Sequence, residues 1–122
     1  ALMLDTIIFS IDGISNKTVQ KNQKGGSFEK SYNNMKVLAD YRNSRKLDKP
    51  LIEWKYVLFN WNDEKKMILE AIKLARQAKV DIISFWPTRT PIYGISWRYY
   101  FSSFFKTIGY KNWKGREVNL RG

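Results

Sequence analysis

Three predicted strands of this sequence end in polar side chains that stand beside aromatic ones. The strand ends hold Ser10, Asp12 and Gly13, then Asn60, Trp61 and Asn62, then Ser84, Trp86, Pro87 and Arg89. Asp12 could accept hydrogen bonds from an amine or a ribose hydroxyl, and Arg89 could hold a carboxylate or a phosphate. Ligands of parallel α/β folds lie at the carboxyl ends of the strands, so we predict one wall of a binding site there. Trp61 and Arg89 are its candidate substrate contacts.

Each of these strand ends also has a purely structural interpretation. The run from Ser10 to Gly13 is a turn signal, in which Asp12 would only cap the following turn. The Asn-Asp pair at 62–63 fits the cap of the next helix. The Trp-Pro pair at 86–87 could simply close the rim of a barrel.

The elements that carry these ends alternate between strands and helices. Residues 4–12 are almost continuously apolar, which is typical of a parallel strand buried on both faces. Ser27 is suited to cap an amphipathic helix from Phe28 to Asn43. A strand over 51–60, a second amphipathic helix and a strand over 80–87 follow. This order gives two βαβ units, so we predict an α/β fold with about three parallel strands and right-handed crossovers.

The last part of the chain, residues 90–122, is aromatic and basic. A helix from Ser96 to Ile108 is expected, because four large apolar side chains share one stripe there. The length of 122 residues fits a single domain, in which 90–122 would be a C-terminal extension.

The composition excludes several kinds of site. The chain contains neither cysteine nor histidine. These residues alone therefore cannot form a disulfide, a zinc finger, a cysteine-ligated iron–sulfur cluster or a Ser-His-Asp triad. No apolar run is long enough to span a bilayer and no signal peptide is visible. We therefore expect a cytoplasmic protein without a membrane partner.

The net charge of +11 raises the prospect of a polyanionic partner. The basic residues are scattered along the chain, which also fits an ordinary solvated surface. An alternative function is therefore a small RNA-binding or protein-interaction module. In that module Trp97, Tyr99, Tyr100 and Trp113 would stack on bases.

Three segments resemble consecutive parts of one enzyme family. DTIIFSIDG, followed by GGSFEKSYNNMKVLADYR, resembles the fourth strand and helix of a radical S-adenosylmethionine (radical SAM) barrel. WKYVLFNWNDEKKMILEAIKLARQAKVD is similar to the fifth strand and helix, and IISFWPTR to the sixth strand. The resemblance covers residues 4–89 and is closest to the branch that contains molybdenum-cofactor biosynthesis protein A and the SPASM-type Fe–S oxidoreductases. It implies a partial (β/α) TIM-like barrel.

The resemblance also implies a chemistry and a set of contacts. Such enzymes cleave S-adenosylmethionine reductively at a [4Fe–4S] cluster, and the resulting radical abstracts hydrogen from a substrate. Ser10 would lie near the methionine or ribose part of S-adenosylmethionine, with Asp12 on the same rim. Asn60 would be a second polar contact. The segment Phe85 to Pro87 would pass the adenine, largely through its backbone groups.

The chain departs from the family pattern in one respect. The family holds its cluster with Cys-x3-Cys-x2-Cys after the first strand, and this chain has no cysteine and opens almost directly on the fourth strand. We therefore expect a fragment that carries part of the cofactor wall, is inactive alone and binds no cofactor tightly. A half barrel leaves sheet edges open, so we also expect a homo-oligomer.

Overall fold

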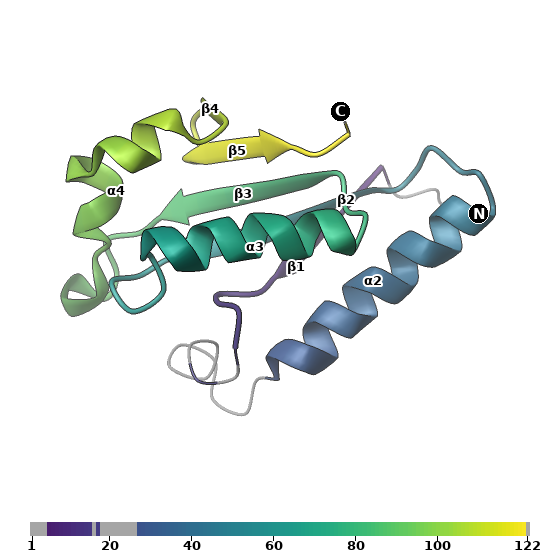
Figure 1. The fold of residues 1–122 in the computed structure, drawn as a ribbon, viewed down its shortest axis with the longest axis horizontal. Helices are drawn as coiled ribbons and strands as arrows, with labels where there is room; N and C mark the ends of the chain where they lie inside the picture. Colours follow the sequence, from purple (N-terminus) through teal and green to yellow (C-terminus); the bar gives the residue numbers. More distant parts are fainter. Residues whose placement is uncertain (1–4, 16, 18–26, 122) are drawn as a thin grey trace.

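The fold is built around one open, mixed sheet of five strands (Figure 1). The computed structural model describes residues 5–15, 17 and 27–121. The strands are β1 (Thr6–Ser10), β2 (Leu51–Leu58), β3 (Ile82–Pro87), β4 (Tyr110–Lys111) and β5 (Arg116–Asn119). Their spatial order is β1-β2-β3-β5-β4. The first three strands are parallel, whereas β5 runs antiparallel to both β3 and β4.

Two long helices cover one face of the parallel strands. They are α2 (Phe28–Ser44) and α3 (Lys65–Gln77). Alternate side chains of β2, such as Trp54 and Tyr56, are completely buried in the core that these helices cover. Tyr32 of α2 donates a hydrogen bond to the Leu74 carbonyl of α3 at 2.7 Å, which joins the two helices. Ser27 caps α2 as predicted, since its hydroxyl accepts a hydrogen bond from the Lys30 amide.

The chain after β3 forms shorter helical segments than the sequence pattern predicts. The single helix expected from Ser96 to Ile108 is wrong. The structure has a short α4 (Trp97–Phe101) and then a 3₁₀ turn, η2 (Ser103–Thr107), after an earlier 3₁₀ turn, η1 (Ile92–Gly94). Ser102 separates α4 from η2, and its hydroxyl accepts a hydrogen bond from the Phe104 amide. Such local bonding competes with continuation of the helix.

The first strand is an edge strand, and the prediction that both its faces are buried is wrong. Side chains of β1 alternate in exposure, and Ile8 is 51% exposed. Within the described ranges, β2 is the only strand that pairs with β1. The α/β class with three parallel strands is confirmed. The sheet stays open, however, and an unpredicted antiparallel pair, β4 and β5, follows β3 in place of a further parallel strand.

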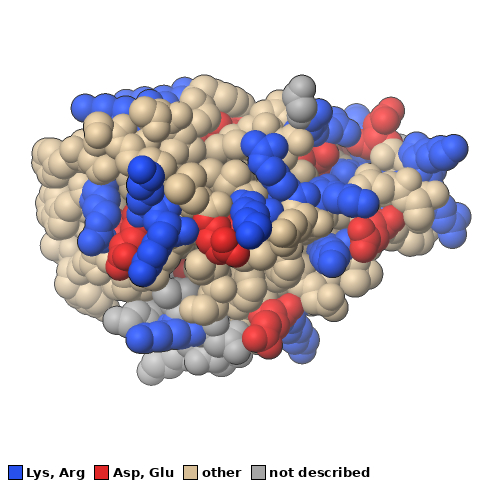
Figure 2. Space-filling model, in the orientation of Figure 1, with Lys and Arg blue, Asp and Glu red and all other residues tan. Residues whose placement is uncertain are grey.

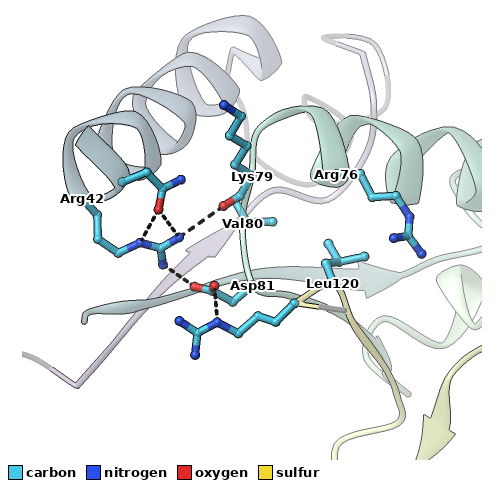
Figure 3. Close-up of a pocket in the computed structure, with 8 residues that line it drawn as sticks. Arg42, Arg76, Lys79, Val80, Asp81 and Leu120 are labelled. Atoms are coloured by element: carbon cyan, nitrogen blue, oxygen red, sulfur yellow. Dashed lines mark hydrogen bonds and ion pairs between the residues drawn. The ribbon is translucent and has the colours of Figure 1, made fainter. Parts of the chain in front are cut away.

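Asp81, directly before β3, ties four parts of the fold together (Figure 3). Its Oδ2 atom accepts hydrogen bonds from the Arg42 guanidinium of α2 and, at 2.8 Å, from the Ile52 amide of β2. Its Oδ1 atom lies 2.9 Å from Nε of Arg121, which follows β5. Its backbone amide donates to the Ile52 carbonyl, and its carbonyl accepts from the Leu120 amide. Only 5% of the Arg42 side chain and 4% of the Asp81 side chain are exposed.

We expect Asp81→Asn to lower the free energy of unfolding by about 3–5 kcal/mol, because it leaves the buried Arg42 charge without its partner. Urea denaturation followed by circular dichroism measures this change. Asp5→Asn is the matched control, because it removes the exposed ion pair with Lys49. We expect that control to cost no more than about 1 kcal/mol. Equal effects of the two substitutions would contradict the role given to Asp81.

Candidate functional site

The face of the sheet opposite α2 and α3 carries a row of polar side chains. Ser10, Lys55, Ser84 and Glu117 occupy one row, because the strand register pairs Ser10 with Lys55, Lys55 with Ser84 and Ser84 with Glu117. Glu53 and Trp86 lie two residues away on the same face. We call Ser10, Glu53, Lys55, Ser84, Trp86 and Glu117 the polar face. Glu53 and Lys55 alternate with the buried aromatic residues of β2, a signal that sequence reasoning did not use.

Two carboxylates of the polar face share one ammonium group. The Lys114 Nζ atom lies 3.4 Å from Oε1 of Glu53 and 3.6 Å from Oε1 of Glu117. Ser84 donates a hydrogen bond to Oε2 of Glu53 at 2.7 Å. The Tyr110 hydroxyl donates to Glu117, and this hydrogen bond raises the pKa of Tyr110. The carboxylates are thus already paired, and they fix the loop before β5 against the sheet.

Ser10, Lys55 and Trp86 are the accessible members of the polar face, because Glu53, Ser84 and Glu117 are buried. The Lys55 Nζ atom lies 4.2 Å from the centroid of the Trp86 ring. The indole nitrogen of Trp86 donates to the Ser84 hydroxyl at 2.7 Å, which fixes the ring. Ser10 is exposed and lies beside Lys55. Together these groups offer a hydroxyl, an ammonium and a flat ring to one ligand.

Asp12 and Asn62 lie in a buried network at the carboxyl ends of β1 and β2. Asp12 is 2% exposed, and its Oδ1 atom accepts a hydrogen bond from the Val57 amide at 3.1 Å. The Asn62 side chain donates to the carbonyls of Asp12 and Val57 and accepts from the Phe59 amide at 2.8 Å. These bonds hold the end of β1 against β2. Both side chains thus bond backbone groups of the fold, although Asn62 does not cap the next helix as its structural interpretation proposed.

Tyr56 joins this hydrogen-bond network from the core side. Its hydroxyl donates to the Asn62 carbonyl at 2.5 Å. Burial, and then the nearby carboxylates of Asp12 and Asp63, raise the pKa of Tyr56 far above its ordinary value. The hydroxyl therefore keeps its proton and remains a donor.

Asp63 does not cap α3, contrary to the predicted Asn62–Asp63 cap. The helix begins at Lys65, and Glu64 occupies the cap position without a side-chain hydrogen bond. The Asp63 side chain is completely buried and accepts hydrogen bonds from Ser96, at 2.6 Å, and from Arg98. Asp63 therefore anchors the start of α4, a role that the sequence pattern did not reveal.

Asn60 and Trp61 lie beside the loop that holds η1. The Asn60 side chain donates to the Tyr93 carbonyl at 2.5 Å. The Trp61 ring stacks on Phe59, with centroids 4.7 Å apart. A Cβ atom on Gly94 would approach the Trp61 ring to 3.0 Å, so a larger residue there would require the ring to shift by a few tenths of an ångström. Both side chains thus help to position this loop.

The predicted site residues at the end of β3 lie partly in the core and partly at the surface. Phe85 is completely buried, and its ring packs on Tyr56 with centroids 5.3 Å apart. Pro87 is half-buried and lies against Gly115. Arg89 is exposed and lines a cavity together with Trp97 and other side chains of the α4 region. The structure therefore brings Arg89 together with aromatic residues.

A different recess lies at the opposite, amino end of β3. Its volume is about 450 Å³, and it is lined by Arg42, Asn43, Arg76, Lys79, Val80, Asp81, Leu120 and Arg121 (Figure 3). Its one carboxylate is already held by two arginines. Because this carboxylate already has two charged partners, we interpret the recess as a structural junction.

Figure 2 shows Lys and Arg side chains in several groups with acidic side chains between them.

Three further findings bear on function. No group of three or more acidic side chains within residues 5–15, 17 and 27–121 could hold a metal ion. No helix in this part of the chain is both long enough and apolar enough to cross a membrane. Among known proteins, no family profile, no curated protein and no solved structure matches the chain.

We expect Asn62→Ala to lower the free energy of unfolding by about 2–4 kcal/mol, because it leaves several buried backbone groups without partners. Asn60→Ala is the control, since it removes one exposed hydrogen bond and should cost about 1 kcal/mol or less. Thermal and urea denaturation measure both effects. A larger loss for Asn60→Ala would show that the wrong asparagine has been assigned to the buried network.

Proposed function

We propose that this chain forms part of the S-adenosylmethionine-binding wall of a radical SAM-type barrel and is not catalytically competent alone. The observation that supports the proposal best is the one-sided arrangement of β1, β2 and β3. These strands are consecutive and parallel, α2 and α3 cover one face, and the polar face lies on the other. A (β/α) barrel needs the same arrangement, with helices outside and the second face turned inward. A cytoplasmic location belongs to this proposal.

The residues of the polar face fit S-adenosylmethionine. Ser10 and Lys55 offer a hydroxyl and an ammonium to its amino-acid end, and Trp86 offers a ring to a flat group. Asp12 would act by fixing the strand end, because its carboxylate is buried against the Val57 amide. The reactive carbon belongs to the cofactor, and these residues would bind and orient it.

The residues do not fit a [4Fe–4S] cluster, because the chain has no thiol to ligate iron. We therefore assign no redox step to this chain. The remaining predicted contacts are also more restricted than the sequence pattern implies. The Phe85 ring is buried, so only its backbone could meet the adenine. Trp61 and Arg89 remain proposed substrate contacts, and Arg89 is the more exposed of the two.

We expect S-adenosylmethionine to bind weakly, because the chain offers one wall of a site and no metal cluster. An amide NMR titration at millimolar cofactor should shift signals near Ser10, Lys55 and Trp86. Ser10→Ala should reduce those shifts, and Ser103→Ala, an exposed serine outside the polar face, should leave them unchanged. Shifts centred on the Asp81 junction, or tight binding in calorimetry, would contradict this proposal.

We also propose that the chain forms a homo-oligomer through the open edge of β1. Edge strands present unpaired backbone groups that another chain can pair with. We expect an assembly at micromolar concentration in sedimentation equilibrium, and Ile8→Glu should shift it toward the monomer. Val37→Glu is the matched control, because Ile8 is 51% exposed and Val37, on α2, is 57% exposed. A monodisperse wild-type monomer would exclude the proposed assembly.

A further inference from the structure

A cavity lies beyond the carboxyl end of β3, beside α4. Its volume is about 560 Å³, and its lining consists of Arg89, Ile95, Trp97, Tyr100 and Phe101. This volume lies within the range of small-molecule sites in proteins. In Figure 1, α4 lies past the arrowhead of β3, at the end of the sheet where α/β folds bind ligands.

The walls of this cavity are aromatic and exposed. The Trp97 and Phe101 rings stack on each other at a centroid separation of 6.1 Å and an interplanar angle of 19°. Trp97 is 57% exposed and Phe101 is 78% exposed. Neighbouring exposed aromatic side chains mark binding surfaces more often than solitary ones do. A flat ring in this cavity would remove apolar surface from water.

The structure anchors the element that carries these rings. Ser96 caps α4 and also donates a hydrogen bond to the buried Asp63 carboxylate. Arg98, in the first turn of α4, pairs with the same carboxylate. A short helix held in this way presents its rings with little conformational freedom left to lose on binding.

Arg89 supplies a positive charge that is available to a ligand. Three of the other six arginines are already paired: Arg42 and Arg121 with Asp81, and Arg98 with Asp63. Arg89 is exposed and makes no ion pair with any residue that the structure describes. A guanidinium can bind a carboxylate or a phosphate through two parallel hydrogen bonds.

We propose that this cavity binds a planar aromatic ring that carries an anionic group, with the ring on Trp97 and Phe101 and the anion on Arg89. Such a ligand could be a nucleoside monophosphate or an aromatic carboxylate, since both combine the same two features. The inference shares Arg89, a proposed substrate contact, with the proposed function, but it uses no residue of the polar face. Its failure and the failure of the cofactor wall are therefore distinguishable.

Isothermal titration calorimetry on the full chain tests this site. The two ligand arms are adenosine monophosphate and indole-3-acetate, and adenosine is the uncharged control. We expect the monophosphate or the carboxylate to bind at least about tenfold more tightly than adenosine, because the anion adds a charge-assisted hydrogen bond. The arm with the higher affinity identifies the source of the anion.

Four variants, all at exposed positions, distinguish binding in this cavity from nonspecific binding. Arg89→Gln should remove the preference for the anion, and Trp97→Ala should weaken every ring-containing ligand about tenfold. Arg45→Gln and Trp113→Ala are matched controls away from the cavity lining and should change nothing. Circular dichroism verifies that each variant is folded.

Several results would overturn the inference. It fails if neither anionic ligand binds at millimolar concentration, or if adenosine binds as tightly as both anionic ligands. It fails if Trp113→Ala weakens binding as much as Trp97→Ala does. Displacement of the bound anion by equimolar S-adenosylmethionine would assign the cavity to the cofactor and would also overturn it.

Discussion

The fold depends on a buried ion pair at the amino end of β3. The Asp81 carboxylate accepts hydrogen bonds from the Arg42 guanidinium of α2 and the Ile52 amide of β2. It also forms an ion pair with Arg121, which follows β5. One carboxylate thus fixes the end of a helix, the register of two parallel strands and the return of the C-terminal strand. The buried charges are tolerated because each has a charged partner and further hydrogen bonds.

The opposite end of the sheet is also held by buried polar groups. Asn62 joins the ends of β1 and β2, and Asp63 joins α4 to the segment before α3. With both ends fixed, the parallel strands form a rigid frame. The side chains left accessible by this frame are Ser10, Lys55 and Trp86 on the polar face, and Arg89 with the α4 rings beside it. These two surfaces are where we place binding.

The sequence predicted the parallel strands, both long helices and the Ser27 cap, because each depends on a local pattern that burial on the helix side reinforces. The sequence-based prediction was wrong where contacts between distant parts of the chain decide the structure. Ile8 reads as a core residue but lies on an uncovered face of an edge strand. Asn62 and Asp63 read as caps because the pattern does not reveal their partners Asp12 and Ser96. The Lys114 contact with Glu53 joins residues 61 apart in sequence, so no local signal indicates it.

We propose that β1, β2 and β3 belong to a larger radical SAM-type barrel whose cluster is held by other residues. Sequencing of the coding DNA upstream of Ala1 in its native context tests this proposal. We expect an open frame that continues upstream and encodes three more βα units, with Cys-x3-Cys-x2-Cys after the first strand. A frame that starts at or just before Ala1 would exclude such a barrel.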